Sequence, residues 1–207
     1  MNRLKFAVRC SAVATSAVLL ASVAGMAVAE DNHGSNDVNV NVGISKLDVP
    51  GVLAMSVAGT TAALTETGST PTVRQFTGKL PTVTVTDTRT ADQIPAGAGW
   101  YVLGTSSDFT GDAGQDPIGA DHLGWSPKMI DGGAAGLVAE GDQVDTVMDS
   151  GPNAVGLVDQ ELLALAFDSG TIASEGQWTA SANLFLRTPV TVAPGNYTAK
   201  LTLSLFE

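Results

Sequence analysis

Cysteine is almost absent from this chain of 207 residues, in which Cys10 is the only one. Beyond residue 10 the chain can therefore form neither a disulfide nor a thiolate metal site. Aromatic side chains are few as well, with three tryptophans, two tyrosines and six phenylalanines. The stability of a fold must then come from apolar packing and from strand pairing.

Basic residues are also scarce, with ten lysines and arginines against 21 acidic residues. Three of the ten lie in residues 1–29, which hold no acidic residue, so the remaining 178 residues carry a formal charge of −14. Nucleic acid is therefore an unsuitable partner, because its phosphates require cations. An anionic membrane or wall polymer would also be repelled unless a divalent cation bridged the two, and solubility is the simplest consequence of the charge.

The first 29 residues have the pattern of a secretory signal. The basic region contains Arg3, Lys5 and Arg9, and an apolar run follows at residues 11–26. The run ends in the small residues Ala27-Val28-Ala29. This order predicts cleavage before Glu30. The alternative is a retained anchor, but the run is shorter than the ~20 residues that a span needs. Cys10 lies at the start of the run, whereas a lipid-attachment cysteine would lie at its end. No membrane span is predicted in the mature chain.

Residues 30–37 are predicted to be a flexible tether, and residues 38–207 a single domain. The domain begins with a run at 38–45 in which aliphatic residues alternate with Asn, Gly and Ser, the pattern of a half-buried strand. Further strands are predicted at 52–57, 61–65, 72–75, 81–86, 100–106, 123–130, 143–148, 162–168, 179–186 and 197–206. Residues 158–167 could instead form a helical turn or two. Many short strands separated by turn clusters predict an all-β fold, a β-sandwich of immunoglobulin-like or jelly-roll-like type.

Four segments resemble the WxL domain of Gram-positive surface proteins. They are LPTVTVTDTR (80–89), GWYV (99–102), DF (108–109) and APGNYTAKLTLSL (193–205). Trp100-Tyr101-Val102 stands where that family has its first motif, whereas Leu203 occupies the place usually held by the second tryptophan. The resemblance implies a secreted β-sandwich held non-covalently at the cell wall, in association with peptidoglycan and with other surface proteins.

The three tryptophans are the candidate ligand-binding residues: Trp100, Trp125 and Trp178. An exposed indole can stack on a sugar or anchor a protein interface. Trp125 is the strongest candidate, because its Gly124-Trp125-Ser126-Pro127 setting suggests a strand edge. The alternative is that each indole fills the core of the sandwich.

Four aspartates between two of these tryptophans form a candidate calcium loop: Asp108, Asp112, Asp116 and Asp121, spaced by glycines. Oxygen-rich loops can bind calcium, but this spacing does not follow the EF-hand order, and a solvated loop is the alternative.

Enzyme chemistry is not indicated. His33 lies in the predicted tether, which leaves His122 as the sole histidine of the domain, with no nucleophile-elbow motif. Paired carboxylates can cleave glycosides, but nothing distinguishes Glu140, Glu161 or Glu175 from surface acids. The sequence therefore predicts a cell-surface binding or structural module without catalysis. One alternative is a subunit of a surface assembly or fibre, in which the 38–45 strand adds to a neighbour's sheet; a secreted hydrolase is the other.

Overall fold

The computed structural model describes residues 41–44 and 49–207, and residues Leu47–Glu207 belong to one compact unit. The predicted signal peptide and tether lie outside the described residues. Of the predicted strand at 38–45, the four described residues belong to no strand, and Val42 and Ile44 are 81% and 89% exposed. For those four residues the prediction of a half-buried strand is wrong, because they form no strand and the side chains of Val42 and Ile44 are exposed.

The larger sheet has six strands arranged around one long strand, β10. On one side β10 pairs with β7, and on the other it pairs with β4 and then with β3, while β1 and β2 lie outside these two. The bounds are β1 Leu53–Val57, β2 Thr65–Glu66, β3 Val73–Lys79, β4 Val83–Asp87, β7 Leu123–Asp131 and β10 Gln177–Pro189. All pairs are antiparallel, and β3 and β4 cover successive lengths of β10.

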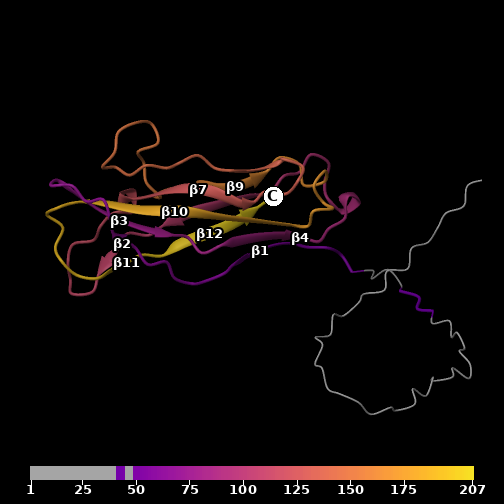
Figure 1. Cartoon of the computed structure of the whole chain (residues 1–207), viewed down its shortest axis with the longest axis horizontal. Helices are drawn as coiled ribbons and strands as arrows, with labels where there is room; N and C mark the ends of the chain where they lie inside the picture. The colour runs from indigo at the N-terminus through magenta and orange to yellow at the C-terminus, as the bar shows by residue number, and fades with distance from the viewer. Residues whose placement is uncertain (1–40, 45–48) are drawn as a thin grey trace, which may run out of the picture. The chain divides into compact units, whose positions relative to one another are not determined.

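The smaller sheet has four antiparallel strands in the order β12, β5, β9, β8. Their bounds are β5 Tyr101–Ser106, β8 Val138–Glu140, β9 Glu161–Ala166 and β12 Leu201–Phe206. Two short strands, β6 (Thr110–Gly111) and β11 (Tyr197–Thr198), form a separate pair. The only helical turns in the described residues are the 3-10 turns η1 (Ala91–Gln93) and η2 (Ala120–His122). The predicted all-β, sandwich-like fold is confirmed (Figure 1).

The core lies between the two sheets and takes side chains from both. Val83, Trp178 and Leu184 come from the six-stranded sheet, whereas Val102 and Leu163 come from the four-stranded one. Alternation explains this, because successive residues of a strand point to opposite faces of its sheet.

Three predicted elements need correction. Residues 61–65 contribute only Thr65 to a strand, and residues 143–148 make only isolated bridges through Val144 and Asp145. In residues 143–148 the chain turns instead, because the Asp149 carboxylate accepts hydrogen bonds from the N–H and the hydroxyl of Thr146. The predicted strand at 197–206 is divided into two strands: β11 pairs with β6, and β12 pairs with β5. Residues 161–166 form β9 rather than a helical turn.

Candidate functional site

None of the three tryptophans presents a binding surface. Trp125 is 0% exposed, and Trp100 and Trp178 are each 1% exposed. The prediction of an exposed Trp125 at a strand edge is wrong, because β7 pairs with β10 on one side and Trp125 bridges Val144 on the other. Trp100 and Trp178 pack together with ring centroids 5.5 Å apart. All three indoles fill the core, as the alternative interpretation proposed.

The four aspartates do not converge on a common point. The Asp108 carboxylate accepts a hydrogen bond from the Ala120 N–H at 2.9 Å. Asp112 accepts one from the Asn196 side-chain amide at 2.8 Å, and this bond is the main cause that lowers the pKa of Asp112. Asp116 is exposed, and Asp121 is half-buried. Among residues 41–44 and 49–207, no three acidic, histidine or cysteine side chains lie together as metal ligands.

Two of the side chains considered for catalysis, His122 and Glu175, have structural partners. A ring nitrogen of His122 lies 2.6 Å from the Arg187 carbonyl oxygen. The Glu175 carboxylate accepts hydrogen bonds from the Trp178 indole at 2.8 Å and from the N–H groups of Ala134 and Ala135, and these bonds lower the pKa of Glu175. Burial and the nearby Asp159 raise the pKa of Glu161.

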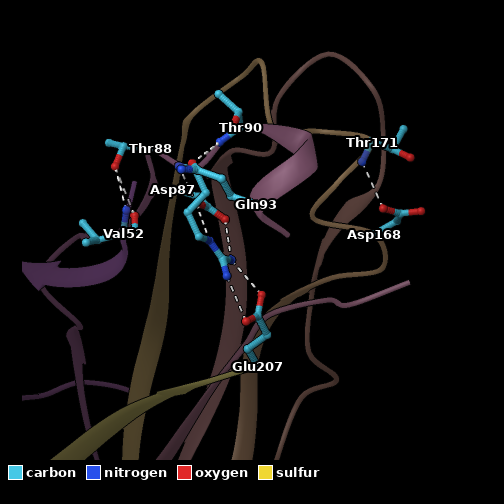
Figure 2. Close-up of polar contacts among 9 residues, drawn as sticks. Val52, Asp87, Thr88, Thr90, Gln93, Asp168, Thr171 and Glu207 are labelled. Atoms are coloured by element: carbon cyan, nitrogen blue, oxygen red, sulfur yellow. Dashed lines mark hydrogen bonds and ion pairs between the residues drawn. The ribbon is translucent and has the colours of Figure 1, made fainter. Parts of the chain in front are cut away.

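One end of the sandwich carries a polar cluster built around Arg89, which follows β4. Its guanidinium donates to both oxygens of Asp87 at 2.9 and 2.7 Å, and to both oxygens of Glu207 at 2.9 and 2.7 Å. Figure 2 labels Asp87 and Glu207 and marks with dashed lines the hydrogen bonds that their carboxylates accept. The Asp87 side chain is fully buried and that of Arg89 is 12% exposed. The bonds to Asp87 are the main cause that raises the pKa of Arg89.

An open depression beside this cluster is lined by Thr88, Arg89, Thr90, Thr171 and Ser174, among others. Its hydroxyls and its cation could suggest a ligand site. However, the carboxylates of Asp87 and Glu207 already accept the hydrogen bonds of the Arg89 guanidinium. Thr88 Oγ1 in turn accepts a hydrogen bond from the Val52 N–H at 2.9 Å. The cluster therefore joins the end of β4, in one sheet, to the end of β12, in the other, and its role is structural.

The strongest candidate for a binding surface is the outer face of the four-stranded sheet. Six apolar residues define it: Tyr101 and Leu103 of β5, Leu162 and Leu165 of β9, Phe206 of β12, and Phe167 just after β9. In register, Tyr101 lies opposite both Phe206 and Leu165, and Leu103 lies opposite Leu162. None of the six belongs to the core cluster or packs against it.

This outer apolar face exposes a large aromatic surface. Phe167 is 63% exposed, Tyr101 38% and Phe206 37%. The rings of Tyr101 and Phe206 stack with centroids 5.4 Å apart and an interplanar angle of 19°. The three leucines are half-buried. Solvent-facing sides of antiparallel sheets normally carry polar residues, so an apolar outer side indicates a surface that another molecule covers.

The six-stranded sheet has an outer face of the opposite character. Lys79 and Asn183 lie opposite each other there, and Ser126 and Lys128 follow on β7. Arg187 lies over the ring of Phe185, 5.0 Å from its centroid, and pairs with Asp149. By contrast, strands β5, β8, β9 and β12 contain no lysine or arginine. The two outer faces therefore differ in both polarity and charge.

Sequence reasoning missed the outer apolar face. The signal was present in β9 and the residue after it, ELLALAF, where apolar residues occupy both faces of a strand. Such continuous runs are typical of strands that are covered on both sides.

No protein-family model, no curated protein and no solved structure matches the chain. The resemblance to WxL domains therefore stays a prediction. Among the described residues, no helix has the length and apolarity needed to cross a membrane.

Proposed function

We propose that this protein is an exported cell-surface module with a binding or structural role and no catalysis, held non-covalently at the wall by a partner surface protein. The partner covers the outer apolar face. The observation that carries the proposal is the aromatic surface formed by Tyr101, Phe167 and Phe206 on an otherwise acidic protein.

The size of this surface supports an interface. At ~200 Å² for each ring, exposures of 38%, 63% and 37% leave roughly 280 Å² of aromatic surface in contact with water. The largest contiguous apolar patch of a typical monomeric protein measures about 300–600 Å² and often has a binding role. The half-buried leucines between the rings enlarge the patch. A protein partner is favoured over glycan stacking by tryptophan, because all three indoles are buried.

Binding to envelope preparations tests the proposal. Labelled chain starting at Glu30 is added to envelopes of the exporting cells, either intact or stripped of surface proteins by protease. We expect binding to intact envelopes, a loss of binding after protease treatment, and at least about tenfold weaker binding by Phe167→Ser, because its ring is buried in the complex.

The matched control is Ile130→Ser. Ile130 is 53% exposed and lies on β7 of the other sheet, so its removal should leave binding unchanged. Equal binding by Phe167→Ser and the unaltered chain, or undiminished binding to protein-free sacculi, would contradict the proposal.

A further inference from the structure

The sandwich has an open side between two edge strands, β1 and β12. In the described part of the chain, β1 pairs only with β4, and β12 pairs only with β5. Leu53 at the start of β1 lies opposite Asp87, and Arg89 joins Asp87 to Glu207 just after β12. The two edges therefore meet at the same end of the sandwich, and the β12 edge offers unpaired backbone groups.

Apolar side chains along this side are incompletely covered. Leu201, Leu203 and Leu205 of β12 pack against the core but remain half-buried, as do two residues of β1. One strand further in, Val83 of β4 is 1% exposed and Val102 of β5 is 0% exposed. The core thus lacks a cover along the β12 edge.

The chain itself contains a segment that matches this edge. In residues 38–44, Val38, Val40, Val42 and Ile44 alternate with Asn39, Asn41 and Gly43. Along β12, three leucines alternate with Thr202 and Ser204 in the same way. A strand beside β12 would place its aliphatic residues next to these leucines and its asparagines next to Thr202 and Ser204.

Charge and exposure make residues 38–44 a suitable donor of this strand. Residues 38–44 hold no charged side chain, so they can approach an acidic protein without added repulsion. In the single chain Val42 and Ile44 are 81% and 89% exposed, and both are therefore available to another molecule.

We propose that residues 38–44 of one copy add as a strand to the free edge of β12 in a second copy. The added strand supplies the backbone partners that β12 lacks and covers Leu201, Leu203 and Leu205. Each copy has one donor segment and one acceptor edge, so the contact is head-to-tail and can build a linear assembly. The edge adjoins the outer apolar face, with which it shares Phe206 of β12, but this assembly does not depend on the proposed partner protein.

Cross-linking tests the contact directly, because the chain from Glu30 has no cysteine of its own. Two single-cysteine proteins, Asn41→Cys and Thr202→Cys, are mixed and treated with a short bismaleimide. We expect a cross-linked heterodimer. Asn183→Cys, exposed on the outer face of β10, replaces Thr202→Cys as the control and should give none.

A chain that carries both Asn41→Cys and Thr202→Cys separates the two possible donors. We expect its cross-linked dimer to disappear on dilution without a gain of internally linked monomer. An internal link that persists on dilution would show that each segment covers its own edge, and it would overturn the proposal. Equal cross-linking to residues 202 and 183, or none to either, would overturn it as well.

A pair of matched variants tests the side chains. Val42→Asp and Asn41→Asp add the same charge to adjacent residues that would face opposite sides of the added strand. We expect Val42→Asp to weaken self-association in sedimentation by at least about tenfold, because a valine is no longer buried, and Asn41→Asp to have a much smaller effect. Equal weakening by both, or a chain that stays monomeric at about 1 mM, would contradict strand addition.

Discussion

Replacing Arg89 by methionine should destabilise the fold more than any other single charge removal in the described residues. The change deletes the four side-chain bonds to Asp87 and Glu207 and leaves the fully buried Asp87 carboxylate without its counter-ion. Removing one partner of a buried pair costs ~3–5 kcal/mol, because the remaining charge stays desolvated. At about 2–4 °C per kcal/mol for a domain of this size, Tm should fall by roughly 6–20 °C.

Urea unfolding followed by tryptophan fluorescence measures this free energy, since all three indoles lie in the core. Glu207→Gln serves as a comparison: its side chain is 29% exposed, so its loss should cost only about 1 kcal/mol. Asp87→Asn together with Arg89→Met should recover part of the loss, because no unpaired charge remains buried. If Arg89→Met costs no more than Glu207→Gln, the buried ion pair does not join the two sheets as described.

Two further predictions concern packing and protonation. Gly104→Ala should lower the free energy of unfolding by ~1–3 kcal/mol, because the added Cβ would lie 2.5 Å from Cη2 of the buried Trp125. Gly59→Ala is the control: the nearest atom to its added Cβ would be 3.5 Å away, so it should have little effect in the same urea titration. Hydrogen bonds from Arg74 and Ser69 lower the pKa of Glu66 to about 2, from an ordinary value of 4.5. The stabilisation from this carboxylate is therefore present above pH 4.5 and lost as the pH falls toward 2. An NMR titration should show the Glu66 pKa return toward 4.5 in Arg74→Gln, and an unchanged value would contradict the assignment.

Much of the fold could be predicted because alternation is a local property of the sequence. Strands such as β4, β5 and β9 follow directly from their runs of Val, Leu and Ala. Prediction failed at residues 143–148, where the Asp149 carboxylate turns the chain back on itself. It also failed for the break before β12, because β11 pairs with the distant β6.

The candidate site was less accessible to sequence reasoning. The burial of Trp125 depends on Gly104, a residue of the opposite sheet that leaves room for the indole ring. The glycine and proline around Trp125 suggested an edge, but they say nothing about a residue across the sandwich. The outer apolar face likewise requires the register that sets Tyr101 beside Phe206 and Leu165, and no local pattern encodes this register.

The ion pair between Arg89 and Glu207 joins residues 118 positions apart, and this separation has a consequence for the order of folding. In the export that we propose, the chain emerges from its N-terminus, so β1 and β4 become available to pair early, whereas β5 must wait for β12. Closing so long a loop is entropically costly, and folds dominated by distant pairings form slowly. During that interval the edge of β5 stays unpaired and open to proteases and to other chains. We therefore expect the pairing of β12 with β5 to be a late step in the formation of the four-stranded sheet.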